Sequence, residues 1–364
     1  MPIPIEALEV AAYTIPTDEP ESDGTLQWDS TTLVVVHVQA GGQIGMGFTY
    51  CHASAAKVVD DKLRTVTVGS DGLSVERNFQ GMWRRVRNMG RPGIASCAIS
   101  AVDIALWDLK ARLLSVSLID LLGGVRDRVA IYGSGGFTSY DIFKLKQQLC
   151  GWQAQGISQF KMKVGRQPDA DLQRVAAARE AVGPEARLFV DANGAYDIKQ
   201  ALTLGAQFCD LGVTWYEEPV SSDNLSGLKL LRERSPAPLE IAAGEYGYDV
   251  FYFRQMLENE AVDVLQVDMT RCGGVTAFMK ANTLCEAFSV PLSAHTAPAL
   301  HAHVGCCSPA VRHVEYFHDH VRIEGMLFDG VPELEQGTLA PDRSCNGHGM
   351  TLRMKDAERF RIPY

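Results

Sequence analysis

Three largely apolar segments near the start of the chain, separated by turn-forming or acidic residues, have patterns typical of strands. They predict strands over residues 6–16, 32–38 and 44–50, the last two joined by a Gly41-Gly42 turn. Between the first two lies an acidic stretch, Thr17 to Trp28, which is too polar for a core and is expected to be a loop. From Ser54 to about Leu114 the apolar spacing becomes helical. A sheet followed by helices predicts an α+β domain over residues 1–125.

After about residue 126, short apolar segments alternate with amphipathic helices. The predicted strands begin near Val129, Gln159, Arg187, Val213, Leu239, Val262, Pro291 and Val311. Helices are predicted between them over residues 141–154, 170–182, 197–210, 223–234, 248–258 and 274–288. Eight repeats favour a closed (β/α)8 barrel over residues 126–320, with its active site at the carboxyl ends of the strands. An open doubly wound sheet is the alternative, although no G-x-G-x-x-G follows a strand; residues 321–364 lack the repeat and are expected to pack on the first domain.

Composition narrows the classes of partner. The chain carries a net charge of −10 and a pI near 5.4, which argues against nucleic acid or an anionic membrane. No apolar run approaches the roughly 20 residues that span a bilayer, and the first residues lack a basic segment ahead of an apolar one, so we expect a cytoplasmic protein. The nine cysteines include no C-x-x-C pair and indicate buried thiols rather than disulfides or a zinc site.

Two lysines occur in the predicted strand FKMKV, which runs from Phe160 to Val164. Because side chains alternate along a strand, the three apolar residues share one face, and Lys161 and Lys163 share the other. The later strands also end in polar residues, in chain order Asp191 with Asn193 two positions on, Glu217, Glu245, Asp268, His295 and Glu315. Each of these alone is compatible with a helix cap, an ion pair or a satisfied interior histidine. Together they predict a polar barrel mouth.

Three of these carboxylates would repel one another if they were buried together. Burial and mutual repulsion would raise the pKa values of Asp191, Glu217 and Glu245 strongly. A hard divalent cation removes this repulsion. Because all the ligands are oxygens, we predict one Mg²⁺, with Mn²⁺ as a substitute, rather than zinc.

The ordered strand-end residues resemble those of the enolase superfamily, and within it the mandelate racemase subgroup of the mandelate racemase/muconate lactonizing enzyme family. The motifs that carry the resemblance are K-x-K, D-x-N, E-E-P, G-E, the Asp of VDMTRCGG and the His of SAHTAP at six successive strands, with AVDIALWDLK and LLGG nearer the start. The resemblance spans nearly the whole chain. It implies an α+β capping domain that closes over a (β/α)8 barrel, and Mg²⁺ bound by Asp191, Glu217 and Glu245. In Glu217-Glu218 the first glutamate would be the ligand, and Glu218 would point away.

The resemblance also implies abstraction of the proton α to a carboxylate. Lys163 would be one base, its pKa lowered by Lys161 and the metal, and Lys161 would also pair with the substrate carboxylate. On the opposite side, His295 would be the second acid/base, oriented by Asp268 through a ring N–H bond.

Two further residues are expected to contact a small carboxylate substrate. By the resemblance, Glu315 would donate a hydrogen bond to the substrate carboxylate as a protonated acid. Asn193 would contact a substrate hydroxyl. Members of the family are often dimers or octamers, so a homo-oligomer is expected.

Two bases on opposite faces of one carbon suit more than one reaction. Racemisation or epimerisation requires one base to remove the proton and the other to return it, whereas dehydration requires an acid that expels a β-hydroxyl. We favour dehydration of a sugar acid, an aldonate or aldarate, to a 2-keto-3-deoxy acid, because sugar-acid dehydratases are common in this subgroup. Muconate cycloisomerisation is disfavoured because such relatives tend to carry a lysine in place of Asp268. A catalytically silent scaffold is a further alternative, but every acid/base position of the subgroup is filled.

The acidic stretch is the candidate specificity loop. It offers carboxylates suited to hydroxyl recognition at Asp18, Glu19, Glu21 and Asp23, although a solvated surface loop is an equal interpretation. Three further histidines do not lie at the predicted strand ends and are expected to pack in the interior rather than to line the pocket: His52, His301 and His303.

Overall fold

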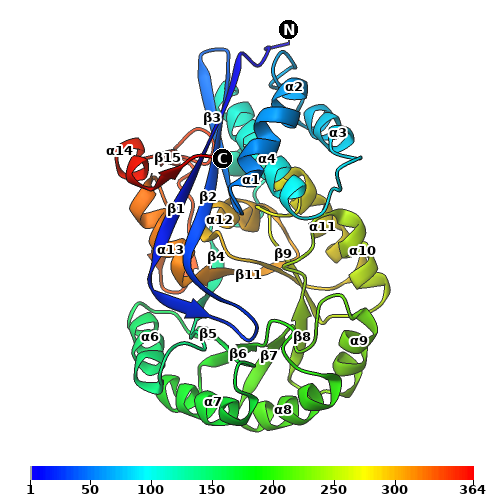
Figure 1. Ribbon diagram of the computed structural model, residues 1–364, viewed down its shortest axis with the longest axis vertical. Coiled ribbons are helices and arrows are strands. Elements are labelled where there is room, and N and C mark those ends of the chain that lie inside the picture. The colour runs from blue at the N-terminus through cyan, green and yellow to red at the C-terminus, as the bar shows by residue number, and fades with distance from the viewer. Residues whose placement is uncertain (1) are drawn as a thin grey trace.

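The computed structural model describes residues 2–364 and places a closed barrel of parallel strands next to an antiparallel sheet (Figure 1). The barrel strands are β4 (Val129–Gly135), β5 (Gln159–Lys163), β6 (Arg187–Asp191), β7 (Val213–Glu217), β8 (Glu240–Ala243), β9 (Val264–Val267), β10 (Leu292–Ala294) and β11 (Val311–Phe317). They pair in chain order, and β11 pairs with β4 to close the barrel. The predicted barrel is therefore confirmed, and the open sheet is wrong.

A helix follows each barrel strand and covers the outside of the barrel (Figure 1). The helices are α6 (Ile142–Ala154), α7 (Pro168–Val182), α8 (Ile198–Asp210), α9 (Leu225–Arg234), α10 (Val250–Glu258), α11 (Gly274–Phe288), α12 (Pro298–Cys307) and α13 (His318–Leu327). The first six lie where the amphipathic pattern predicts them. All ten residues of α12 are buried, so this helix has no polar face that a periodic pattern could reveal.

Aromatic side chains fill the lower part of the barrel. Tyr132, Phe189 and Trp215 form a separate buried cluster with Ala242 and Val264. The rings of Phe189 and Trp215 stack with their centroids 5.3 Å apart. This layer of side chains fills the barrel interior. A substrate can therefore bind only beyond it, at the carboxyl ends of the strands.

The antiparallel sheet has the strand order β16-β1-β2-β3, with β1 at Ala7–Ser22, β2 at Gln27–Ala40, β3 at Gln43–Tyr50 and β16 at Arg361–Ile362. Helix α4 (Ile94–Leu113) packs on it at very close range. A Cβ at Gly45 would lie 2.2 Å from the Ala105 carbonyl oxygen, and one at Gly47 would lie 2.3 Å from that of Ala101. Glycine at these two positions therefore allows the helix to contact the strand backbone. The shorter helical segments beside them are α1 (Ser54–Val58), the π-helical turn at Val59–Leu63, α2 (Arg64–Thr67), α3 (Val75–Arg85) and α5 (Leu118–Leu122).

The expectation of an acidic loop over residues 17–28 is wrong. Strand β1 continues to Ser22 and β2 begins at Gln27, so the two strands form a hairpin that extends from the sheet across the barrel (Figure 1). Their register shifts between Pro16 and Glu21. Polar residues form strands here because the ribbon has one face toward the barrel and the other toward solvent, and not because it joins a core.

The last part of the chain contacts both the sheet and the barrel. Strand β16 pairs with β1, whereas β14 (Thr338–Leu339) pairs with β4 and with β13 (Leu334–Glu335). The short strands β12 (Phe328–Asp329) and β15 (Thr351–Leu352) pair with each other, and α14 (Met354–Ala357) and the 3-10 turn Glu358–Phe360 precede β16. Over residues 2–364, no helix is both long and apolar enough to cross a membrane.

Candidate active site

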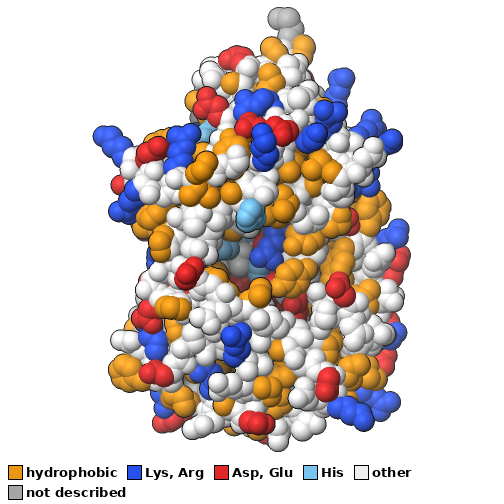
Figure 2. All heavy atoms as spheres, viewed as in Figure 1, with side chains coloured by type: hydrophobic (Ala, Val, Ile, Leu, Met, Phe, Trp, Pro, Cys, Tyr) orange, Lys and Arg blue, Asp and Glu red, His pale blue; other side chains and the backbone are white. Residues whose placement is uncertain are grey.

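A cavity of about 690 Å³ opens at the carboxyl ends of the barrel strands, under the β1–β2 hairpin. Figure 2 shows a hollow in this face of the molecule, with basic, histidine and acidic side chains inside it. The barrel contributes Lys163, Asn193, Glu245, His295 and Glu315 to its lining. These five predicted residues therefore border one common space. The other four contact them without lining the cavity: Lys161, Asp191, Glu217 and Asp268.

Three carboxylates meet beside this cavity. One ligand atom from each of Asp191, Glu217 and Glu245 lies within 4.8 Å of the other two, and all three residues are buried. Glu217 Oε2 also accepts a hydrogen bond of 2.9 Å from Trp215 Nε1. Burial, together with the negative charge of Asp191, raises the pKa of Glu217 to about 8. Three ionised carboxylates at this spacing therefore require positive charge beside them.

These residues fit a magnesium ion by their chemistry. The donor atoms are all carboxylate oxygens, they come from three adjacent barrel strands, and they are held apart from bulk water by burial. Glu218, the neighbour of Glu217, is also buried but is not in this group of mutually close ligand atoms. Its Oε1 has no hydrogen-bond partner within residues 2–364.

Two lysines of β5 pair with the same carboxylates. Lys161 Nζ lies 2.6 Å from Glu217 Oε1, 2.7 Å from Glu315 Oε1 and 3.4 Å from Asp191 Oδ2. Lys163 Nζ lies 2.5 Å from Asp191 Oδ2. Without a bound cation, the two ammonium groups therefore supply part of the positive charge at the barrel mouth.

The protein groups around Lys163 act against the lowering of its pKa that was expected from Lys161 and a bound metal. Burial lowers the pKa of Lys163 and so does the Lys161 ammonium, but Asp191 and the other carboxylates outweigh them and hold the pKa above its ordinary value. Lysine–lysine repulsion was the only effect visible in the K-x-K motif. The ion pair to Asp191 depends on the spacing between β5 and β6, which a one-strand motif does not contain.

His295 lies between two carboxylates on the other side of the cavity. Its Nδ1 is 2.9 Å from Asp268 Oδ2, and its Nε2 is 3.1 Å from Glu245 Oε2. Burial lowers the pKa of His295, but Glu245, Glu315 and the hydrogen bond to Asp268 outweigh this and raise it to about 9. Asp268 is fixed in turn by the backbone N–H and the hydroxyl of Thr270, at 2.7 and 2.8 Å. The imidazole is thus held in one orientation from the side away from the cavity.

The structure does not agree with a protonated Glu315. Its Oε1 accepts a hydrogen bond of 2.6 Å from Ser134 Oγ and pairs with Lys161, and its Oε2 accepts one of 3.1 Å from the Thr296 backbone N–H. Burial raises the pKa of Glu315, but Lys161 and His295 outweigh burial and lower it to about 2. Every contact to this carboxylate comes from a donor, so it is ionised here.

Asn193 has an unusual backbone conformation at the edge of the cavity. Its φ is +47°, and its backbone N–H donates to Asp191 Oδ1 at 2.9 Å. The side-chain Oδ1 is buried and has no hydrogen-bond partner in the described part of the chain. This leaves the amide oxygen available to a hydroxyl group of a ligand.

Several cavity residues were not found by the sequence interpretation. They come from the hairpin, from the ends of β3 and β11, from the loops after β8 and β9, and from α13: Trp28, Thr32, Tyr50, Tyr246, Arg271, Phe317 and His320. Tyr50 and His320 stack with their ring centroids 3.5 Å apart. Arg271 donates to the Glu245 backbone oxygen at 3.2 Å and lies 3.4 Å from Asp268 Oδ2. Arg271 lies in the motif VDMTRCGG, three residues after Asp268, and this position could have indicated from the sequence that it lines the site.

Two expectations about the lining need correction. Of the four acidic residues in the hairpin, only Asp23 lines the cavity; its Oδ1 accepts bonds from the backbone N–H groups of Thr25 and Leu26. His52 lines the cavity although it was expected to pack. His301 does pack: it is buried, and its Nε2 accepts a bond from the Met269 backbone N–H.

His303 packs as well, in the fully buried helix α12.

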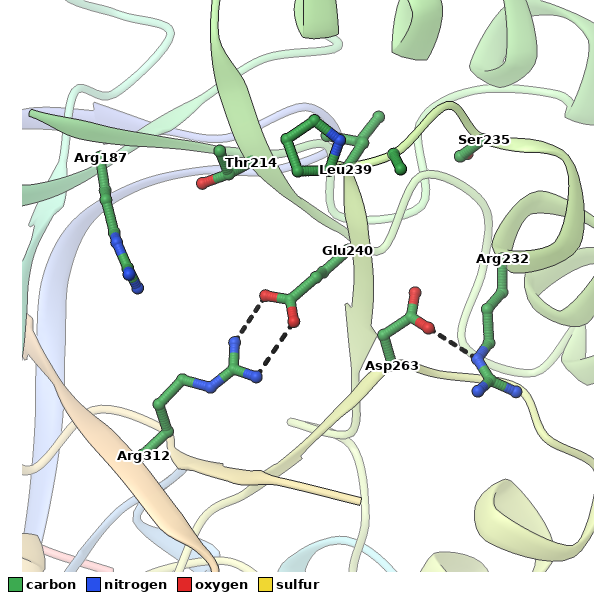
Figure 3. A pocket seen from close by; sticks show the side chains of 10 residues that line it. Arg187, Thr214, Arg232, Ser235, Leu239, Glu240, Asp263 and Arg312 are labelled. Carbon is green, nitrogen blue, oxygen red and sulfur yellow. Dashed lines mark hydrogen bonds and ion pairs between the residues drawn. The ribbon is translucent and has the colours of Figure 1, made fainter. Parts of the chain in front are cut away.

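A second large cavity, of about 750 Å³, lies at the opposite end of the barrel (Figure 3). Arg312 forms a bidentate pair with Glu240 there, and Arg232 Nε lies 2.7 Å from Asp263 Oδ1. Both carboxylates of this cavity are thus neutralised, so it offers no acid/base pair comparable to Lys163 and His295.

Two family models match the chain. The model described as mandelate racemase / muconate lactonizing enzyme, N-terminal domain, matches residues 11–123. The model described as enolase C-terminal domain-like matches residues 144–357. A curated relative, the 3,6-anhydro-alpha-L-galactonate cycloisomerase of Streptomyces coelicolor, is 32% identical over 98% of this chain and 99% of its own length.

Solved structures agree with the sequence matches. A mandelate racemase/muconate lactonizing enzyme-like protein from Rubrobacter xylanophilus is 49% identical with a TM-score of 0.96, covering 98% of this chain and 99% of its own. The L-talarate/galactarate dehydratase of Salmonella typhimurium LT2, liganded with Mg and L-lyxarohydroxamate, is 27% identical with a TM-score of 0.91. This similarity covers 100% of this chain and 94% of the dehydratase.

Proposed function

Since the chain belongs to the mandelate racemase/muconate lactonizing enzyme family of the enolase superfamily, we propose that it removes the proton α to the carboxylate of a sugar acid and eliminates a β-hydroxyl. The observation that carries the proposal is the placement of Lys163 and His295 on one cavity with three buried carboxylates between them. Such a pair can act on opposite sides of one carbon atom. The product would be a 2-keto-3-deoxy acid.

Asp191, Glu217 and Glu245 would hold Mg²⁺, because their clustered oxygens match its preferred ligands. The ion, when bound, supplies the positive charge that favours loss of a proton next to a carboxylate. A positioned base alone contributes only about 10²- to 10⁴-fold to the rate. The cluster of carboxylates is therefore required as much as the bases.

The bases carry out two proton transfers. Lys163 Nζ takes the α-proton, so the electron pair of the C–H bond forms a C=C bond as the C–O bond to the β-hydroxyl breaks. His295 Nε2 gives its proton to the departing oxygen, which leaves as water. The enol that results tautomerises to the 2-keto acid. The contact of 2.9 Å between His295 Nδ1 and Asp268 Oδ2 supports this role, because the carboxylate stabilises the protonated ring that acts as the acid.

Other residues of this chain would orient the substrate. Lys161 is fully buried beside Glu315, which lines the cavity, and its ammonium would pair with the substrate carboxylate. Asn193 offers its unpartnered amide oxygen to a hydroxyl. Glu315 is proposed to position Lys161 and His295 as an ionised carboxylate, in place of the protonated donor implied by the family resemblance.

Cycloisomerisation of a sugar-acid derivative is the second candidate. It is favoured by the curated relative of nearly equal length, whose printed name is 3,6-anhydro-alpha-L-galactonate cycloisomerase. The same two bases could remove an α-proton and break or form a ring C–O bond in place of expelling water. Racemisation or epimerisation would use the bases for two proton transfers at one carbon.

One screen separates these reactions. The protein with Mg²⁺ would be incubated in D₂O with a library of aldonic acids, aldaric acids and their lactone and anhydro forms, and followed by NMR. We expect a 2-keto-3-deoxy acid from at least one open-chain acid. Ring opening without loss of water would support cycloisomerisation, and deuterium exchange without a keto product would support epimerisation. No reaction and no exchange across the library would favour a catalytically silent scaffold; His295→Asn is the matched control for background.

A further inference from the structure

A second group of potential metal ligands lies outside the barrel mouth. Asp18 and Glu21 come from the β1–β2 hairpin, and His318 is the first residue of α13. One ligand atom of each lies within 4.8 Å of the other two. His318 Nε2 is 3.0 Å from Asp18 Oδ2, so these groups already contact one another between two elements that are 300 residues apart in the chain.

Glu21 gives an independent sign that this group accommodates a ligand. Its side chain is fully buried, and its Oε2 accepts a hydrogen bond of 2.8 Å from Trp28 Nε1. Its Oε1 is also buried, yet no donor among residues 2–364 reaches it. A buried carboxylate oxygen without a donor is costly, because it has lost its bonds to water.

The surrounding charges do not neutralise this group. Asp319 adds a third carboxylate, and its charge and that of Asp18 add to burial in raising the pKa of Glu21 to about 8. The nearest cation, Arg322, is directed elsewhere: it donates to Asp319 Oδ1 at 3.0 Å and to the Pro16 backbone oxygen at 2.7 Å. Lys144 pairs with Glu19 at 2.7 Å. Arg322 is thus paired with Asp319, and the Oε1 of Glu21 has neither a cation nor another donor bonded to it within residues 2–364.

We propose that Asp18, Glu21 and His318 form a second metal site, which takes a divalent transition metal such as Zn²⁺. One imidazole nitrogen and two carboxylate oxygens are typical zinc ligands, whereas Mg²⁺ prefers oxygen alone. Donors about 2.1 Å from a tetrahedral zinc ion lie about 3.4 Å apart, so side chains whose ligand atoms are within 4.8 Å of one another would approach by up to about 1.4 Å on binding the ion. The two metal sites of the protein thus differ in the class of ion that they select.

This site joins the hairpin to the barrel. Trp28, which is bonded to Glu21, lines the catalytic cavity, and Phe317, which precedes His318, lines it as well. An ion held by Asp18, Glu21 and His318 would fix the distance between the hairpin and the start of α13. Metal coordination would then add to the contacts that already hold the hairpin over the cavity, such as His318–Asp18 and Lys144–Glu19.

The test uses the full chain saturated with Mg²⁺, to which Zn²⁺ is added and binding is measured by calorimetry. We expect one Zn²⁺ per chain, with affinity at least about tenfold lower in His318→Gln and in Glu21→Gln. The variant Glu19→Gln is the control, because it removes a carboxylate of the same hairpin that lies outside the group and should bind Zn²⁺ like the wild type.

A crystal of the wild-type protein grown with both ions locates the zinc without relying on the folding of a variant. An anomalous peak among Asp18, Glu21 and His318 supports the site. A peak only among Asp191, Glu217 and Glu245 would show that zinc merely replaces magnesium and would overturn the proposal. Absence of Zn²⁺ binding by the Mg²⁺-saturated wild type, or equal binding by all three variants, would overturn it as well.

Discussion

Lys163 on β5 is in register with Asp191 on β6, and its Nζ lies 2.5 Å from the Asp191 Oδ2. The same relationship recurs in the site, because each proposed metal ligand contacts one cationic or imidazole group. Lys161 contacts Glu217, and His295 contacts Glu245. In the protein without a cation, ligands and bases therefore neutralise each other. A cation that engages the carboxylates would weaken these pairs and free the bases for proton transfer.

Removal of the metal should abolish activity for this reason. With EDTA present, Lys163 stays paired with Asp191 as an ammonium and cannot accept a proton. We expect no turnover on the substrate found in the screen, and recovery when Mg²⁺ is added in excess of the chelator. Formation of 2-keto acid is the measurement. Activity that is unchanged by chelation would contradict both the metal assignment and the release of the base.

Replacement of either base should remove turnover. In Lys163→Ala no group remains to take the α-proton, and in His295→Asn none remains to protonate the leaving oxygen, so kcat should fall by at least about 10²-fold in each. Lys146→Ala is the matched control, since this lysine pairs with Glu180 on the outside of the barrel. Full activity of either site variant would disprove the two-base arrangement.

The two adjacent glutamates at the end of β7 should differ in their effect on magnesium. Glu217→Gln removes a charge from the group of mutually close oxygens, so the affinity for Mg²⁺ should fall at least about tenfold. Glu218→Gln keeps the shape of a side chain that lies outside this group and should retain most of the affinity. Calorimetric titration of both variants with Mg²⁺ makes the comparison. A larger loss in Glu218→Gln would show that the ligand is the second glutamate.

The sequence was informative where one strand decides the outcome. Alternation along FKMKV correctly places Lys161 and Lys163 on the inner face of a barrel strand, because the period of two is a property of a single strand. The effect of Asp191, which raises the pKa of Lys163, could not be predicted from this motif because Asp191 lies on the next strand. The hairpin at Thr17 to Trp28 was missed for a related reason. Its polar residues are ordered by contacts with α13 and with the loop after β4, and not by an apolar pattern of their own. Examples are the contact of Asp18 with His318 and the bond of 2.7 Å from Thr138 Oγ1 to the Asp23 backbone oxygen.

Glu324 on α13 should make the stability of the protein depend on pH. Its Oε2 accepts a bond of 3.0 Å from the Ala299 backbone N–H at the start of α12, while its Oε1 is buried without a partner in the part of the chain that the structure describes. Burial raises the pKa of Glu324 to about 8. Because the folded state binds this proton more tightly than the unfolded state, where the pKa is about 4.3, stability is lost as the pH rises toward 8.

The size of this effect follows from the difference between the two pKa values. Between pH 6 and pH 8, the free energy of unfolding should fall by about 2 kcal/mol on account of Glu324 alone. Glu324→Gln is neutral at every pH and should show a smaller fall, by that amount, in urea unfolding at constant Mg²⁺. Glu286→Gln, at an exposed position of α11, is the isosteric control and should keep the wild-type slope. Other buried acids titrate in all three proteins, so the difference in how steeply the free energy of unfolding falls with pH is due to Glu324. An equal fall in Glu324→Gln and the wild type would mean that this carboxyl is already ionised at pH 6.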